Sequence, residues 1–182
     1  MVAYRRSRPE DYDAMVRLAD ANYIDNLTPQ QRKDGFLSVR FIREDFARMA
    51  NEIGIVVGIE NNELAGFLCA EWIDKTGMPP VVAMAARTFR AGRFRGKPGS
   101  EWKAFLEGPL CIAAEHRGEG LRRGLHKALM DAVREQYEVA VSFIAFDNAR
   151  SYHGATAHGG EDEVGSFEVS GKQYHVLAFP VD

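Results

Sequence analysis

The chain has 182 residues, of which 46% are hydrophobic and 27% are charged, and these values are ordinary for one globular domain with its own core. The formal net charge of −3 argues against a general nucleic-acid-binding protein, which needs a basic face, and no apolar run approaches the ~20 residues of a membrane-spanning helix. We therefore expect a single cytoplasmic domain over residues 1–182, with neither nucleic acid nor membrane as a partner.

The N-terminal part of the chain predicts one short strand followed by helices. The strand is expected over residues 2–6, and Ser7-Arg8-Pro9-Glu10 is typical of a capping box that starts a helix. Thr28-Pro29-Gln30-Gln31 is a second capping signal, and a further helix is expected over about 41–50. The loop at 34–37 contains two apolar residues, which either complete the core or overhang a binding site.

The middle of the chain predicts a hairpin and then a basic segment. Residues 54–60 and 63–73 are its strands, and Asn61-Asn62 is the turn, because asparagine tolerates positive φ. The second strand is apolar on both faces and is therefore central, with Glu71 either reaching water or facing a substrate amine. Residues 74–103 contain an expected helix and a basic, glycine-rich stretch, which is either a solvated surface or an arm that binds an anionic group.

The stretch that follows indicates a site for a phosphate group. An apolar strand over residues 105–113 leads into the turn Arg117-Gly118-Glu119-Gly120, and an amphipathic helix begins at Leu121. The first amides of a helix lack partners and carry partial positive charge, and glycine lets an anion approach closely. An ordinary tight loop into a core helix gives the same pattern, so the two interpretations stay open here.

The C-terminal part predicts a strand, a short helix and a hairpin. The strand covers residues 139–146, and the segment from Asp147 to Tyr152 begins the helix. His153 and His158 lie close by in the sequence. The hairpin is expected to use residues 165–170 and 173–181, with the turn at Gly171-Lys172.

Two of these motifs resemble those of the GNAT superfamily of acyl-CoA-dependent acyltransferases. The family's pyrophosphate loop is Arg/Gln-x-x-Gly-x-Gly/Ala after an apolar strand, and Arg117 and Gly120 match it, whereas Arg122 stands where a small residue is usual. Its second signature is a strand followed by Asn-x-x-Ala/Ser, matched by Asn148 and Ser151. The resemblance implies an α+β (mixed α/β) fold with a central, mostly antiparallel twisted sheet of about seven strands, a splayed fourth strand and flanking helices. It also implies that residues 74–103 are an insertion.

The resemblance further implies the residues of the site. Acetyl-CoA, or another acyl-CoA, would be the co-substrate, and no metal would be needed. The residues expected to bind it are Leu110, Cys111, Ile112, Arg117, Gly118, Glu119, Gly120, Leu121, Arg122, Asn148 and Ser151. Glu107 stands near the family's general base, although a solvated strand-end carboxylate is the plainer interpretation. Tyr152 lies near the place of the family's proton-donating tyrosine, which is Ala155 here, and a core anchor is its plainer role.

The expected function is transfer of an acetyl group from acetyl-CoA to a primary amine of a small-molecule or peptide acceptor by direct attack. Two alternatives stay open: a catalytically impaired acyl-CoA-binding or regulatory module, and a protein that shares only the fold. The resemblance leaves room for a homodimer. Cys69 and Cys111 are expected to be reduced and buried, and the five histidines show no metal-ligand spacing.

Overall fold

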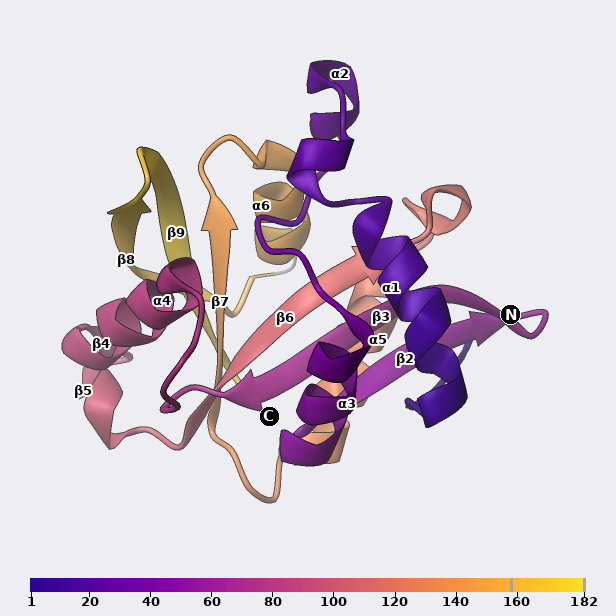
Figure 1. Ribbon diagram of the computed structural model, residues 1–182. Helices are drawn as coiled ribbons and strands as arrows, with labels where there is room; N and C mark the ends of the chain where they lie inside the picture. Colours follow the sequence, from indigo (N-terminus) through magenta and orange to yellow (C-terminus); the bar gives the residue numbers. More distant parts are fainter. Residues whose placement is uncertain (158, 182) are drawn as a thin grey trace.

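The computed structural model describes every residue except His158 and Asp182, so His158 lies outside the described residues. Its centre is a seven-stranded sheet in the order β1-β2-β3-β6-β7-β9-β8, drawn in Figure 1. The strands of this sheet are β1 (Ala3–Arg6), β2 (Gly54–Glu60), β3 (Glu63–Trp72), β6 (Ala104–Ile112), β7 (Val139–Ala145), β8 (Asp162–Val169) and β9 (Lys172–Pro180). All neighbours are antiparallel except β6 and β7. The expected fold class is therefore confirmed.

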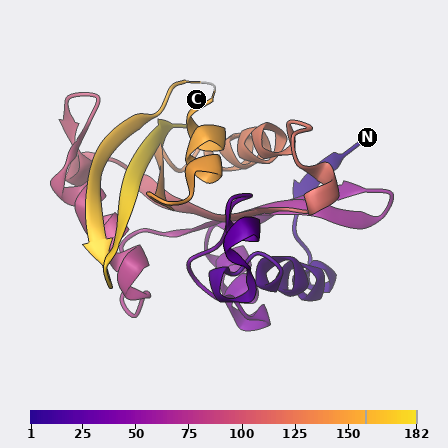
Figure 2. The ribbon, with the colours of Figure 1, turned by 90° about the horizontal axis from the view of Figure 1, so that it is seen from above.

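Helices cover both faces of the sheet, as Figure 2 shows from above. They are α1 (Tyr12–Asp20), α2 (Pro29–Arg32), α3 (Arg43–Glu52), α4 (Pro80–Ala91), α5 (Leu121–Val133) and α6 (Ala149–Thr156). α5 and α6 lie on one face, called the α5 face here, while α1, α3 and α4 lie on the other, called the α1 face.

The central strand β3 contributes to the core on both faces, as its apolar sequence predicts. Leu68 and Ala70 pack with Leu125 of α5 on one side of the sheet. Phe67 and Cys69 pack on the other side, with α1 and α3. Because successive strand residues point to opposite faces, a strand buried on both sides must be apolar throughout.

The turns and caps agree only partly with the prediction. Asn61 and Asn62 form the first hairpin turn with φ of 51° and 65°, and the Thr28 cap is closed by reciprocal hydrogen bonds with Gln31 of 2.9 and 3.3 Å. The first capping box is wrong by one position: the backbone N–H of Arg8 donates to Asp11 (2.7 Å), which also binds Arg5. The terminal hairpin turns at 170–171 rather than at 171–172.

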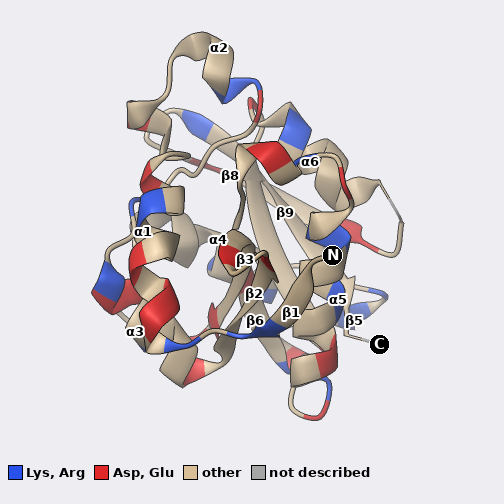
Figure 3. Cartoon of the chain, turned by 90° about the vertical axis from the view of Figure 1, so that its right-hand side faces the viewer, with Lys and Arg blue, Asp and Glu red and all other residues tan. Residues whose placement is uncertain are grey.

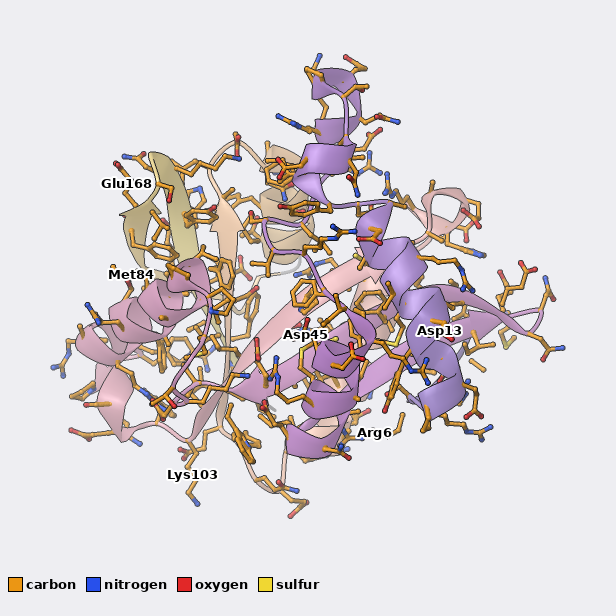
Figure 4. All side chains as sticks on the ribbon, in the orientation of Figure 1. Arg6, Asp13, Asp45, Met84, Lys103 and Glu168 are labelled. Carbon is orange, nitrogen blue, oxygen red and sulfur yellow. The ribbon has the colours of Figure 1, made fainter. Side chains whose placement is uncertain are left out.

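The basic segment at 74–103 is packed against the sheet. Its helix α4 buries Val82, Ala85 and Phe89 in the core on the α1 face, and Figure 4 shows Met84 on this helix beside the β8–β9 hairpin. A small separate hairpin, β4 (Arg93–Phe94) and β5 (Lys97–Pro98), follows it. Arg90 donates to the carbonyl oxygens of Gly99 (2.8 Å) and Trp102 (3.0 Å), so part of its charge fixes the fold.

Charge on the surface is mixed, and no described helix has the length and apolar character to cross a bilayer. In Figure 3, Lys and Arg alternate with Asp and Glu over α1 and α3, with no single basic face on this side. The exposed basic residues of the segment at 74–103 are Arg87, Arg93, Arg95 and Lys103. These four fit the solvated-surface interpretation of that stretch.

Candidate functional site

The most distinctive feature of the sheet is the separation of β6 from β7. Their parallel pairing joins Ala104–Leu106 to Val139–Val141 and goes no further, although β6 continues to Ile112 and β7 to Ala145. Among the described residues, the edge of β6 beyond Leu106 that faces β7 therefore has no strand partner. This separation is the splayed strand expected from the sequence.

A bulge in β6 lies directly beyond the point of separation. Leu68 of β3 is opposite Leu110, but Ala70 is opposite Glu107, so two steps on β3 match three on β6. The extra residue is accommodated at Gly108-Pro109, where Gly108 has φ of 134° and proline has no N–H for the ladder. Glu107 consequently points toward the α5 face, next to the opening.

A cavity of about 520 Å³ fills the opening between β6 and β7 and continues through the sheet. This volume is in the range of small-molecule sites. The lining residues on the α1 face include Phe36, Val39, Phe41, Val82, Leu106 and Phe143. Those on the α5 face include Glu107, Leu110, Ile112, Arg122, Ser142 and Ile144. The α1 side of the cavity is thus mostly apolar, with one carboxylate, Glu71, that is paired with Arg48 and Lys75, whereas among the described residues Glu107 and Arg122 on the α5 side form no such ion pair of a carboxylate with lysine or arginine.

Asn148 holds the loop that closes the cavity on the α1 face. Its side-chain amide donates to the carbonyl oxygen of Phe36 (3.0 Å), and its carbonyl oxygen accepts from the N–H of Ser151 (3.4 Å), which caps α6. Asn148 is only 5% exposed, so both bonds are shielded from water. The first predicted role of the 34–37 loop is confirmed, since Phe36 is 7% exposed and completes the core, and Phe36 also lines the cavity.

The glycine turn forms a second concavity, of about 180 Å³, at the start of α5. Gly118 and Gly120 have φ of 85° and 79°, which only glycine adopts without strain, and a Cβ atom at either would meet no atom within 4 Å. Leu121 and Arg123 also line this concavity. Glu119 is exposed and lines neither cavity, with its carboxylate 3.5 Å from His116. The shape fits an anion bound by the first amides of the helix.

The side chain of Arg117 turns away from this concavity. Its guanidinium donates to Oδ1 of Asn22 (2.7 Å) at the end of α1 and to the carbonyl oxygen of Ile112 (3.4 Å). Arg117 therefore adds its charge to the large cavity, whereas the glycine turn itself relies on backbone groups.

Arg122 separates the two cavities and lines both of them. Its guanidinium lies near Glu107 and Glu161 but makes no hydrogen bond to any described residue. Burial lowers the pKa of Arg122, and the two carboxylates oppose that shift. Arg122 thus stands between the two cavities, at the position where the resembled loop motif usually has a small residue.

Glu107 is buried rather than solvated, so the plainer interpretation of this carboxylate is wrong. Its side chain is 4% exposed, and its Oε1 lies 2.7 Å from Nδ1 of His126 on α5. Its Oε2 is buried without a hydrogen-bond partner among the described residues. The sequence reasoning missed His126, although its spacing of four from Arg122 places both on one side of α5.

Tyr152 does not line either cavity. Its hydroxyl donates to Glu163 (3.1 Å), which raises the pKa of the phenol, and its ring lies 4.4 Å from that of His175. The arrangement gives no support to Tyr152 as a proton donor to the cavity. His153, one residue further along α6, does line it.

The remaining polar candidates are engaged or inert. Glu71 is buried rather than solvated and lines the large cavity, and its Oε2 binds Arg48 (3.2 Å) and Lys75. Cys69 and Cys111 are free and buried as expected, and burial raises the pKa of Cys111 to about 12. Neither thiol is therefore a nucleophile at neutral pH. The described residues contain no group of side chains that could hold a metal ion.

Comparison with known structures identifies the fold. No protein-family model matches the sequence, and no curated protein matches it significantly. A proposed GNAT-family acetyltransferase from Desulfovibrio desulfuricans superposes over 100% of both chains, with a TM-score of 0.66 and 13% identity. The ribosomal-protein-S18-alanine N-acetyltransferase of Escherichia coli matches 100% of this chain and 95% of its own, with a TM-score of 0.63 and 13% identity.

A third similar structure was solved with a bound cofactor. It is yncA of Salmonella typhimurium, a proposed acetyltransferase with acetyl-CoA, which matches over 100% of this chain and 95% of its own. The TM-score is 0.65 and the identity 14%. At such identities the similarity concerns the fold, and this chain has the fold of the GNAT acetyltransferases.

Proposed function

We propose that this protein transfers an acyl group from acyl-CoA to a primary amine. The observation that carries the proposal is the cavity through the split between β6 and β7. It combines an unpaired strand edge, a glycine turn at a helix start and a buried carboxylate. A solvated groove without such a carboxylate would bind a ligand but offer nothing to accept a proton.

Acyl-CoA fits the groups that line the opening. The unpaired edge of β6 at Leu110, Cys111 and Ile112 offers backbone groups to the two amides of pantetheine. The glycine turn offers the N–H groups that begin α5 to the pyrophosphate, with open space in front of Gly118 and Gly120. The guanidinium of Arg122 lies between these two regions and has only to rotate to pair with a phosphate oxygen.

The chemistry requires an amine that has lost its proton. An ammonium cannot attack a thioester, so a base must first accept one of its protons, and Oε2 of Glu107 is the unpartnered oxygen at the cavity. The neutral nitrogen then forms a bond to the carbonyl carbon while the bond from carbon to sulfur breaks. As the amide forms, the nitrogen loses its second proton to water, and CoA leaves as the thiolate and takes up a proton from water.

The α1 face of the cavity favours an acceptor in which the amine is attached to an apolar body. Phe36, Val82 and Phe143 offer contact to hydrocarbon, and burying apolar surface yields about 25 cal/mol per Å². A polyamine or an amino sugar would instead place polar groups against these side chains without partners. We therefore expect small alkyl or aryl amines to be the better acceptors.

Ligand-induced stabilisation is the first test. Acetyl-CoA and CoA at millimolar concentration should raise the melting temperature by mass action, and pantetheine should raise it less. Arg122→Ala should reduce the shift with CoA but leave that with pantetheine unchanged. Lys127→Ala is the matched control, because Lys127 is an exposed residue of α5 that lines neither cavity.

Turnover is then measured as free thiol released from acetyl-CoA with a panel of amines. Stabilisation by CoA with thiol release for at least one amine supports the proposal. Stabilisation without release from any amine favours a binding module that has lost catalysis, as the placement of Arg122 between the two cavities would allow. If CoA produces no stabilisation, the protein shares only the fold.

A further inference from the structure

Glu107 and His126 form a carboxylate–imidazole pair at the narrow end of the split. Glu107 is the first residue of β6 beyond its last pairing with β7. Oε1 of its carboxylate is 2.7 Å from Nδ1 of His126, whereas Oε2 is buried without a partner among the described residues. One oxygen of the carboxylate is thus held by the helix, and the other has no partner among the described residues, in a side chain that lines the cavity.

We propose that His126 is a positioning residue that holds Glu107 in place as the proton acceptor of the amine. The Nδ1–H group donates to Oε1 and fixes the rotamer in which Oε2 serves the cavity. This inference rests on the proposed acyl transfer. It gives α5 two roles, because the helix start at the glycine turn would bind the pyrophosphate and His126 would support the proton transfer.

The imidazole is itself fixed by its surroundings. Its ring meets the ring of Phe179 on β9 edge to face, with centroids 5.5 Å apart. The side chain of His126 is 26% exposed, so its far side reaches solvent while Nδ1 reaches the buried carboxylate. Packing holds the imidazole ring on one side, and a charge-assisted hydrogen bond holds it on the other. A ring fixed in this way restricts the orientation of the Glu107 carboxylate.

Few other groups face this pair. From α5 the charged neighbour is Arg122, which also lies near Glu161 in the segment before β8. On β3 the register partner of Glu107 is Ala70, and β7 brings Ser142 to the same cavity. Among the described residues, His126 is the one hydrogen-bond donor to Glu107, so its removal changes the surroundings of the carboxylate directly.

The direction of that change follows from the hydrogen bond. A donor to a carboxylate stabilises the charged form, so losing the donor disfavours the deprotonated base. A base works only when deprotonated, and the acid limb of the pH–rate profile marks its pKa. Without His126 the acid limb should move to higher pH, and the loss of activity should be larger at pH 6 than at pH 8.

Two substitutions of His126 separate positioning from packing. His126→Leu keeps an apolar side chain of similar size but no donor, while His126→Asn places an amide N–H near the position of Nδ1. kcat is measured from pH 5 to pH 9 at saturating acetyl-CoA and with the best amine of the panel, beside the KM for acetyl-CoA and the melting temperature. Lys127→Ala on the exposed side of α5 is the control for the helix.

We expect His126→Leu to lower kcat by about 10- to 100-fold at pH 7 and to move the acid limb up by about one pH unit, with KM for acetyl-CoA within twofold. His126→Asn should recover most of the loss and return the limb toward its original position. In the Glu107→Gln background, His126→Leu should have almost no further effect, because the two residues act as one unit.

Three results would overturn the inference. They are an unshifted acid limb in His126→Leu, equal losses in the Leu and Asn variants, or a full additional loss in the Glu107→Gln background. Any of these in a protein that still releases thiol leaves the acyl transfer standing and removes His126 from it. If the wild-type protein releases no thiol with any amine, the proposed function itself fails, and His126 has no proton transfer to support.

Discussion

The two sides of the split sheet give the cavity different chemistry. On the α1 face, Phe36, Val82 and Phe143 present hydrocarbon. On the α5 face, Glu107 and Arg122 bring opposite charges within a few residues of an unpaired strand edge. A reaction that joins an apolar-bodied amine to a charged, phosphate-bearing donor would use both sides, one for each reactant.

The difference arises from the local sequence. Residues of β6 before the bulge alternate, so Leu106 joins the core on the α1 face and Phe105 the core on the α5 face. Glu107 follows Phe105 on the α5 face because it is two residues further along the strand, and α5 meets it there with His126. The bulge at Gly108-Pro109 then adds one residue, which keeps Leu110 on the same side as Glu107.

Replacing Glu107, the buried carboxylate on the charged side of the cavity, should cause the largest loss of activity. Glu107→Gln keeps the shape but cannot accept the ammonium proton, so kcat/KM at pH 7 should fall by about 10² to 10⁴-fold. CoA-induced stabilisation should remain, because Glu107 lies away from the glycine turn. Thiol release across pH 5 to 9 is the measurement. An unchanged rate and pH profile would show that Glu107 is not the base and that the α5 face only binds.

A bulkier side chain on the apolar side of the cavity should weaken the binding of the amine acceptor alone. Val82→Phe adds bulk that projects into the cavity, so we expect KM for the amine to rise about tenfold, equivalent to ~1.4 kcal/mol, with KM for acetyl-CoA nearly unchanged. Val81→Phe is the matched control, since Val81 is buried in the same helix but is not among the cavity-lining residues. If Val82→Phe instead raised KM for acetyl-CoA, the apolar side would hold the acyl donor, and the assignment of the two sides would be reversed.

The single strands, turns and helices of the fold could be predicted because they depend on local patterns, and the resemblance to the GNAT motifs supplied their arrangement. The continuous apolar run of β3, the Asn61-Asn62 turn and the glycine turn before α5 each specify their structure within a few residues. The first capping box was misplaced because the local sequence allows a cap that begins at Ser7 as well as one, a residue later, that uses the carboxylate of Asp11. Arg5 on β1 decides between the two, because it binds Asp11. Such a contact between elements leaves no trace in the local pattern.

The site was only partly predictable for the same reason. Leu110, Gly118, Gly120 and Asn148 lie at the cavities because their motif fixes their backbone position. The directions of the long side chains were not foreseeable: Arg117 turns to Asn22, nearly a hundred residues away in sequence. His126 was missed because its importance depends on its contact with Glu107. Only the packing of α5 against β6 in the folded protein brings the two side chains together.

Substitution of Tyr152 tests how far the polar side of the cavity extends. Its hydroxyl donates to Glu163 at the surface, outside the residues that line the cavity. Tyr152→Phe should therefore change kcat by less than about twofold and lower the free energy of unfolding by at most ~1.5 kcal/mol, the lower end of the range for a hydrogen bond to a charged group, because this bond is exposed to solvent. His153→Ala on the cavity side of α6 is the comparison. A loss of kcat in Tyr152→Phe larger than in Glu107→Gln would mean that the phenol reaches the reacting atoms in the bound state, and that the charged side extends beyond the cavity seen here.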